Sequence, residues 1–419
     1  MLPLAKYSMG IGDRFARQGR AQIAAFVAAR AQGIDVTPVW NKSHREHTYV
    51  ATHPDSVRAE ADAAVAALGW TGPYHVDADH ISLKNVDLFL ASSDFFTLDV
   101  ADWIGHEPDA DHLRRFLSAH ADLAAGPLDI PGLADPIRLM PAELEAAARK
   151  FLRAVREAAA IYRRAAQARG ADRIIAEVSM DETDVPQSPA EMVVILAAVA
   201  DEGIPAQTIA PRFSGRFNKG VDYVGNVARF AREFEADVLV ARWAAKRFGL
   251  PRNLKLSVHS GSDKFSIYGP IRDVIQRHDA GLHLKTAGTT WLEEIIGLAE
   301  AGGDGLAIAR EIYAGAHGHI AELCAPYASV IDIRADRLPS PAEMASWNGP
   351  RLARALRHDQ SCPDYNPDMR QLVHVSYKLA AAMGDRYTGA LDRYADVVGH
   401  HVTQNILERH LLRVFPAQV

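Results

Sequence analysis

Short apolar stretches alternate with longer amphipathic stretches along the chain. Each short stretch is β-prone and ends in a polar cluster, and an alanine-rich segment with helical spacing follows it. Eight stretches have this character, at residues 6–9, 37–40, 74–76, 95–98, 173–178, 207–210, 255–258 and 281–284. Alternating strands and helices predict a parallel sheet, and eight units predict an α/β fold of the (β/α)₈ TIM barrel type. An open doubly wound sheet is the alternative, but no GxGxxG follows an early strand.

Two regions exceed the needs of a minimal barrel. The first, about 106–170, separates the fourth and fifth strands and repeats apolar residues at helical spacing in its second half. The second, from about Pro339, carries further amphipathic segments. We therefore expect a catalytic barrel domain over 1–338 with a helical insertion after strand four, and a helical C-terminal extension over 339–419 packed on the barrel.

The composition excludes several classes of protein. Lysine and arginine total 46 against 52 aspartates and glutamates, a formal charge of −6, so no basic field indicates a nucleic acid partner. Cys324 and Cys362 form no CxxC pair, which argues against a disulfide framework or a cysteine–zinc site. The first residues lack a signal-peptide pattern, and apolar stretches such as 192–200 are shorter than the roughly 20 residues that cross a bilayer. We expect a cytoplasmic protein without nucleic acid or membrane partners; a homo-oligomer is compatible with these features.

Carboxylates accompany the third and fifth predicted strands. The third strand leads into Asp77, Asp79 and His80, and alternation along a strand puts the two aspartates on one side. The fifth carries Glu177 inside an apolar run, where a carboxylate must be paired, metal-bound or protonated because isolated burial costs several kcal/mol. A structural salt bridge is the alternative for Glu177, and a helix cap beside a packed imidazole is the alternative for the Asp-His pair. The acidic residues 181–182 precede a predicted helix and are expected to cap it.

Histidines and lysines accompany the seventh and eighth predicted strands. His259 ends the seventh, and the backbone N–H groups of 260–262 are expected to face an anion, with Lys264 adding a positive charge. His283 and Lys285 lie two residues apart on the eighth, hence on one side.

These residues together predict a mononuclear metal site. The carboxyl ends of barrel strands meet at one face, so three imidazoles and nearby carboxylates converge there. Such ligands suit one divalent ion of zinc, manganese, iron, cobalt or nickel, and spacing does not choose among them. The expected imidazole ligands are His80, His259 and His283.

Several longer motifs make the chain resemble the D-tagaturonate/D-fructuronate 4-epimerase family. The resemblance extends over almost the whole chain, and the nine-residue run from Ser257 is long enough to be specific. The motifs are GIGDRF at 10–15, DADH at 77–80, FTLD at 96–99, SVHSGSDKF at 257–265, HVSYK at 374–378 and MGDR at 383–386.

The resemblance implies a metal-dependent epimerase of hexuronate catabolism. It implies a metal held by the three histidines, with Asp79 and Glu177 as the acid/base pair. The reaction would invert C4 of a 2-keto hexuronate, a small sugar acid. The motif around Asp13 lies only about a dozen residues from Met1, closer than the family pattern implies, so a related ketose as substrate is the alternative.

The chemistry of C4 inversion favours retro-aldol cleavage. The C4 hydrogen is β to the ketone and is not acidified by enolisation, whereas loss of the C4 hydroxyl proton with cleavage between C3 and C4 leaves an aldehyde and an enediolate. Re-addition to the opposite aldehyde face inverts C4, with proton transfer by the two carboxylates. Lys264, Lys285 or Arg212 is expected to bind the substrate carboxylate, and Asp77 completes the substrate contacts.

Three other functions stay open at this point. A Schiff-base aldolase would use Lys285 as an amine nucleophile. A metal-dependent hydrolase would use the same ligands to activate water. A sugar-acid sensor without catalysis is the third, although a sensor does not need a buried carboxylate together with three histidines.

Overall fold

Eight parallel strands form the centre of the molecule in a computed structural model, which describes residues 2–181, 183, 185–286 and 288–418. The strands pair in chain order, and β1 also pairs with β8, so the sheet closes into a barrel. The predicted (β/α)₈ fold class is therefore confirmed. The strands are β1 Tyr7–Ile11, β2 Thr37–Ser43, β3 His75–Ile81, β4 Phe95–Asp99, β5 Ile175–Ser179, β6 Ala206–Ala210, β7 Lys255–His259 and β8 Leu282–Lys285.

All eight predicted stretches overlap strands. The largest difference between a predicted and an observed strand end is that of β3. It runs through the Asp-His cluster that the sequence placed after it. Its pairing with β4 shifts between Ala78 and Ile81, and His80 has a φ of 52°, in the left-handed region that non-glycine residues rarely adopt. This irregularity turns His80 out of the regular alternation of the strand.

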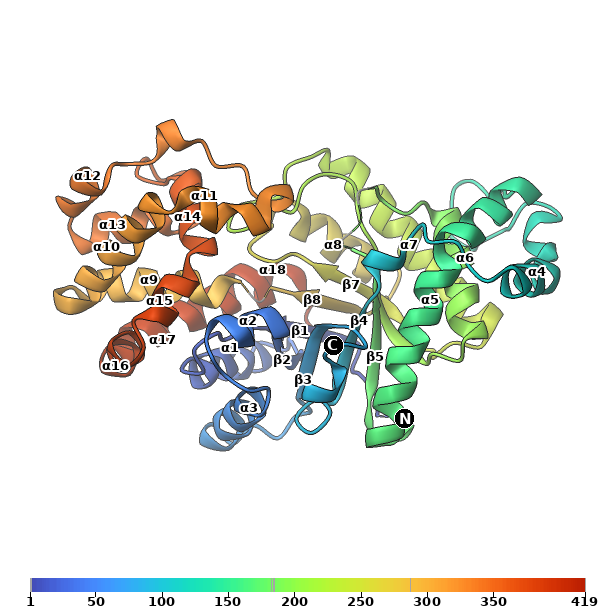
Figure 1. Cartoon of the computed structure of the whole chain (residues 1–419), viewed down its shortest axis with the longest axis horizontal. Helices are drawn as coiled ribbons and strands as arrows, with labels where there is room; N and C mark the ends of the chain where they lie inside the picture. The colour runs from blue at the N-terminus through green and yellow to red at the C-terminus, as the bar shows by residue number, and fades with distance from the viewer. Residues whose placement is uncertain (1, 182, 184, 287, 419) are drawn as a thin grey trace.

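A layer of helices covers the barrel, as the connections between parallel strands require. Helix α5, the second half of the expected insertion, packs against β4 and α6, while α4 packs on α5 (Figure 1). The long helix is therefore the crossover between β4 and β5. The helices from the N-terminus to the one that follows β8 are α1 Gly19–Arg30, α2 His44–Tyr49, α3 Asp55–Ala67, α4 Ala110–Ala119, α5 Pro141–Arg169, α6 Pro189–Asp201, α7 Val227–Phe248, α8 Phe265–Arg277 and α9 Thr289–Ala301.

The rest of the chain forms short helices beside α9, coloured orange to red in Figure 1. Helix α17 packs against both α1 and α9, and α18 packs against α8, so this region is joined to the barrel's helical layer. These helices are α10 Gly303–Gly318, α11 Ile320–Cys324, α12 Pro341–Ala345, α13 Gly349–Leu356, α14 Pro367–Val375, α15 Tyr377–Ala382, α16 Asp385–Arg393, α17 Ala395–Gln404 and α18 Leu412–Val414, with a π-helical segment, Asn405–Leu411, before the last. Among the described helices, none combines the length and apolarity needed to span a membrane.

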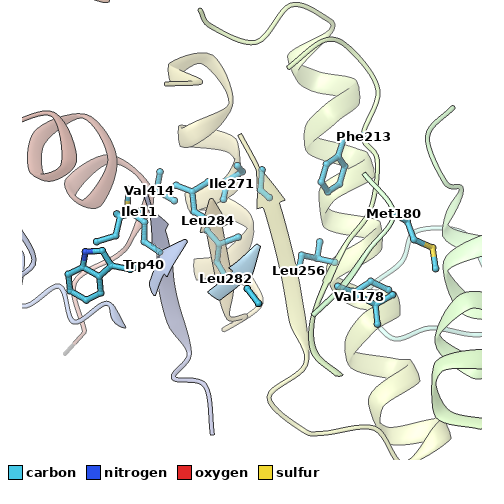
Figure 2. Packing of buried hydrophobic residues seen from close by; sticks show 14 of the residues in the cluster. Ile11, Trp40, Val178, Met180, Phe213, Leu256, Ile271, Leu282, Leu284 and Val414 are labelled. Atoms are coloured by element: carbon cyan, nitrogen blue, oxygen red, sulfur yellow. The ribbon is translucent and has the colours of Figure 1, made fainter. Parts of the chain in front are cut away.

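Alternation along the strands separates an apolar outer surface from a polar interior. Leu282 and Leu284 on β8 belong to the apolar layer between strands and helices, together with Ile271 on α8 and Val414 on α18 (Figure 2). The intervening His283 and Lys285 therefore point to the other side, into the barrel. A separate apolar cluster fills part of the interior and consists of Leu4, Val39, Phe95 and Ile175.

Candidate active site

The carboxyl ends of the strands surround a cavity of about 740 Å³. This is the end at which barrel enzymes carry their reactive groups, because the loops there vary without disturbing the sheet. Side chains from seven strands or the turns that follow them line the cavity: Asn41, Asp79, His80, Asp99, Asp181, Arg212, His259 and Lys285.

His80, Asp181 and His259 form a candidate metal centre at this cavity. One ligand atom from each lies within 4.8 Å of the other two, and no other group of three or more such ligands occurs in the described part of the chain. Asp181 lies 3.6 Å from His80 Nε2 through Oδ1 and 3.1 Å from His259 Nδ1 through Oδ2. Two imidazoles and a carboxylate suit a first-row divalent ion.

The second nitrogen of each imidazole is held by another carboxylate. His80 Nδ1 lies 2.8 Å from Asp79 Oδ1, and His259 Nε2 lies 2.9 Å from Glu177 Oε1. Histidines that bind metals usually donate their other ring nitrogen in this way, which fixes the tautomer and the ring orientation. The arrangement leaves His80 Nε2 and His259 Nδ1 facing Asp181, so the donor set fits a divalent metal.

The carboxylates of this group raise the pKa values of its two imidazoles. Burial lowers the pKa of the His259 imidazole, but the carboxylates of Asp181 and Glu177 raise it to about 9. Burial likewise opposes a charged His80, while Asp79 and Asp181 raise the pKa of its imidazole well above the usual value. Without a cation between them, the carboxylates are thus compensated by protons on the imidazoles.

His283 is not part of this group. Its Nδ1 lies 2.9 Å from Ser8 Oγ, its ring packs on Phe95, and its Nε2 is buried without a hydrogen-bond partner. Burial is the main reason that its pKa falls to about 3. The predicted third imidazole ligand therefore lies deeper in the barrel, and Asp181, expected only as a helix cap, occupies the third position. Glu182, the other residue of that expectation, lies outside the described residues.

Lys285 lies at the centre of three buried carboxylates. Its Nζ is 2.8 Å from Asp77 Oδ2, 2.9 Å from Asp79 Oδ1 and 3.1 Å from Glu177 Oε1. Burial lowers the pKa of its amine, but these three charges raise it well above the usual value. A Schiff-base mechanism needs a neutral amine, so this environment disfavours Lys285 as the nucleophile.

The two predicted acid/base carboxylates differ in their access to the cavity. Asp79 is among the lining residues, whereas Glu177 is fully buried behind His259, with Oε2 lacking a hydrogen-bond partner. Burial would raise the pKa of Glu177, but Lys285 and His259 hold it well below its usual value. Asp77 is also buried, accepts a hydrogen bond from Thr97, and has its pKa raised by burial to about 7.

The cationic side chains predicted to bind the substrate also differ in whether they reach the cavity. Arg212 lines the cavity, but Lys264 is fully buried and donates to Ser262 Oγ at 2.7 Å, so it does not face the cavity. The N–H groups of Ser260 and Gly261 both bond to the carbonyl of Lys285. The prediction that these two groups face an anion is therefore wrong, because the neighbouring strand takes them.

Several cavity residues had no role assigned from the sequence. Arg14 follows β1, pairs with Glu46 at 2.8 Å and has its guanidinium 4.2 Å from the centre of the Tyr377 ring. Arg14 and Tyr377 both lie in motifs of the family resemblance, at 10–15 and 374–378, which is the signal that pointed to them. The C-terminal region thus supplies part of the cavity wall, with His374 as a further lining residue.

Comparisons with known proteins show the family of the chain and agree with its fold. A sequence model of the tagaturonate epimerase family matches residues 2–388. A tagaturonate/fructuronate epimerase of Thermotoga maritima is 29% identical over 239 residues, 56% of this chain and 44% of that protein, so the match spans less than half of the relative. A crystal structure of fructuronate-tagaturonate epimerase from Cohnella laeviribosi superposes with a TM-score of 0.80 at 24% identity, covering 99% of this chain and 83% of that one. A crystal structure of the same enzyme with two glycerols gives 0.80 at 25% identity over the same shares.

Proposed function

The chain belongs to the tagaturonate epimerase family, and we propose that it interconverts D-tagaturonate and D-fructuronate by inverting C4 of a 2-keto hexuronate. The observation that carries the proposal is the convergence of two imidazoles, several carboxylates and a lysine on one cavity at the carboxyl ends of the strands. The family match alone would give the reaction, and the cavity gives the residues to perform it.

Inversion at C4 requires a bond at that carbon to break and form again. The ketone at C2 stabilises negative charge at C3, so cleavage between C3 and C4 is the route that it assists. Loss of the C4 hydroxyl proton gives an aldehyde, which turns and is attacked again on its opposite face. The chain must therefore remove and return a hydroxyl proton, hold the carboxylate end of the substrate and keep water from the aldehyde.

His80, Asp181 and His259 would hold the divalent metal in this reaction. When bound, such an ion acts as a Lewis acid for substrate oxygens and stabilises developing negative charge. The chain's own contribution is to fix the two imidazoles through Asp79 and Glu177. This proposal replaces His283 by Asp181 in the ligand set.

Asp79 is the residue proposed to exchange protons with the C4 hydroxyl. Its Oδ1 already contacts His80 and Lys285, and its side chain borders the cavity. Burial would raise its pKa, but Lys285 and His80 lower it, so the group is an anion. Glu177 acts behind His259, where it orients the ring, and Lys285 balances both carboxylates.

Arg212 is the side chain proposed to bind the substrate carboxylate. It lines the cavity with its guanidinium 3.4 Å from the backbone carbonyl of Asp181, next to the metal candidates, and a guanidinium has the fork geometry that suits a carboxylate. The buried Lys264 and the carboxylate-bound Lys285 are less suited to the role.

Proton NMR of the purified protein with substrate tests the proposal. Tagaturonate should convert to an equilibrium mixture with fructuronate when a divalent metal is present, and not after chelation. Tagatose and fructose serve as matched substrates that lack the carboxylate. Turnover of the neutral ketoses at equal efficiency would contradict a hexuronate substrate, and turnover of neither pair would contradict the epimerase function.

A further inference from the structure

A second buried charged cluster surrounds Asp263, just beyond the end of β7. Its Oδ2 lies 2.9 Å from Arg370 Nη2 and 3.2 Å from His358 Nδ1, and its Oδ1 lies 3.2 Å from His410 Nε2. Asn405 Nδ2 is 3.5 Å from the same Oδ1. All of these side chains are buried, and none of them lines the active-site cavity.

Every partner of Asp263 in this cluster comes from the C-terminal region. His358 follows α13, Arg370 lies on α14, and the other two lie on the π-helical segment Asn405–Leu411. Residues five apart align in a π-helix, and His410 Nδ1 lies 3.0 Å from the carbonyl of Asn405. The local winding thus presents both side chains to one carboxylate.

Asp263 belongs to a polar loop whose side chains are hydrogen-bonded within the protein. Ser260 Oγ donates to the carbonyl of Lys285 at 2.8 Å, and Gly261 has a φ of 66°, in the region that favours glycine. Ser262 Oγ accepts from the N–H of Gly220 at 3.0 Å and from Lys264 Nζ at 2.7 Å. These contacts give structural roles to residues of the SGSDK run, two of which, Ser260 and Gly261, also line the cavity.

Arg370 joins this loop to a second one. Besides its bond to Asp263, its guanidinium donates to the carbonyls of Gly220 and Leu356. Gly220 has a φ of 77°, and a Cβ there would come within 3.3 Å of the Arg370 carbonyl, so the loop lies close against α14. One buried guanidinium therefore contacts three separate segments of the chain.

Both loops border the active-site cavity. Ser260 and Gly261 line it on one side, directly after His259, and Lys219 lines it directly before Gly220. A shift of the first loop would displace His259, which ends the strand before it, and a shift of the second would change the cavity wall at Lys219. Displacements of about 1 Å can lower rates about 10²-fold.

We propose that Asp263 and Arg370 are positioning residues, through which the C-terminal region holds the two loops that carry His259 and Lys219 at the cavity. The kinetic part of this inference rests on the proposed epimerase function. The cluster also contributes to folding, since a buried ion pair with one partner removed is destabilising. The experiment must therefore separate positioning from stability.

The first test compares single and double variants of the full chain with bound divalent metal. Asp263→Asn leaves Arg370 buried without its charge partner, so its melting temperature should fall. In Asp263→Asn/Arg370→Gln both charges are gone, and the melting temperature should recover in part. For the folded protein of either variant, kcat/KM for tagaturonate should stay about 10- to 100-fold low, with KM raised. Wild-type kinetics in the double variant would overturn the proposal.

The matched control is Tyr387→Phe. It removes a buried hydrogen bond of 2.9 Å to Glu294, which also joins the C-terminal region to a barrel helix but touches neither loop. Its melting temperature should fall while kcat and KM stay at wild-type values. If the control changes both constants as much as the Asp263 variant, positioning by this cluster is contradicted.

Hydrogen exchange gives a readout that does not need turnover. Peptides covering 212–222 and 258–264 should exchange faster in Asp263→Asn and, to a lesser degree, in His410→Gln, which keeps the Asp263–Arg370 pair and so should fold. The control should leave them unchanged. Should wild-type protein prove inactive on tagaturonate, the proposed function fails while faster exchange still supports the positioning role; unchanged exchange in both variants overturns that role.

Discussion

Two buried charged clusters in the described part of the chain differ in their balance of charge. Around Lys285 and the two cavity histidines lie four carboxylates, Asp77, Asp79, Glu177 and Asp181, and Lys285 forms ion pairs with the first three. Around Asp263, one carboxylate faces one arginine, and two histidines complete the contacts. The first cluster depends on protons or on another cation, whereas the second is balanced by its own side chains.

This difference indicates which cluster is built for chemistry. Uncompensated buried charge costs several kcal/mol, so an excess of carboxylates persists where a ligand neutralises it or where function requires it. The cluster with the excess borders a cavity at the reactive end of the barrel, and the balanced one is sealed between loops and helices. Burial of charge by itself therefore does not mark an active site; burial with an imbalance next to a cavity does.

The largest expected effect comes from removing a ligand of the first cluster. His259→Ala should abolish turnover and leave dialysed protein without stoichiometric metal, because the remaining two groups cannot hold the ion. Added divalent metal should raise the melting temperature of wild type but not of this variant. His278→Ala, which removes a histidine paired with Glu235 on the outside of the barrel, is the control and should keep both metal and activity. Full metal content in His259→Ala would contradict the assignment.

The same measurement decides between two candidates for the third ligand. Asp181→Ala should lose metal as His259→Ala does, because its carboxylate lies between the two imidazoles. His283→Ala should retain more metal, because its ring lies against Ser8 and Phe95 deeper in the barrel. The reverse order of metal content would return His283 to the ligand set that the sequence predicted.

A smaller effect is expected for the proton-transfer group. Asp79→Asn keeps the shape of the side chain and its contact with His80 but cannot accept a proton, so kcat should fall by about 10²–10⁴-fold. Because Asp79 also orients His80, kcat is compared at saturating metal, where metal content should match wild type and the loss of kcat should remain. Normal kcat in this variant would mean that another group, or water, handles the C4 hydroxyl proton.

Glu177→Gln should have a weaker effect still. The carboxylate acts through His259, and loss of such an outer partner lowers metal affinity or activity by about 10- to 100-fold. Raising the metal concentration should therefore restore much of the lost activity, which it should not do for Asp79→Asn. An equal loss of kcat in both variants at saturating metal would instead support the acid/base pair expected from the sequence.

The fold could be predicted because each strand carries its own signal. Apolar residues point to the helices and polar ones into the barrel, as Leu282, His283, Leu284 and Lys285 illustrate on β8. His80 reaches the cavity through the irregularity near the end of β3. The same alternation placed His259 there, at the end of β7. It did not place His283 at the correct depth: two residues along a strand are about 6.6 Å apart, enough to move a side chain from the cavity to the interior.

The remaining differences between the sequence prediction and the structure come from contacts that no local pattern contains. Asp181 looks like a helix cap in sequence, and its role depends on imidazoles supplied by β3 and β7. Lys264 looks like a substrate cation, but it is fully buried next to Asp263, whose side-chain partners lie about a hundred residues or more further along the chain. The motif at 257–265 does not contain the information that residues so far along the chain pack against it.

The last prediction concerns the C4 hydrogen, for which no exchange with solvent is expected. In retro-aldol inversion the C4 hydrogen stays on its carbon, as the formyl hydrogen of the transient aldehyde, so turnover in D₂O should give product without deuterium at C4. Direct deprotonation by Asp79 would instead introduce solvent deuterium there, and NMR of the product distinguishes the two. A ¹³C label at C3 and C4 should show a kinetic isotope effect where cleavage limits the rate. Stoichiometric deuterium at C4 would contradict the retro-aldol route. It would mean that the carboxylates of the first cluster remove and return the proton on C4 itself, not the proton of its hydroxyl group.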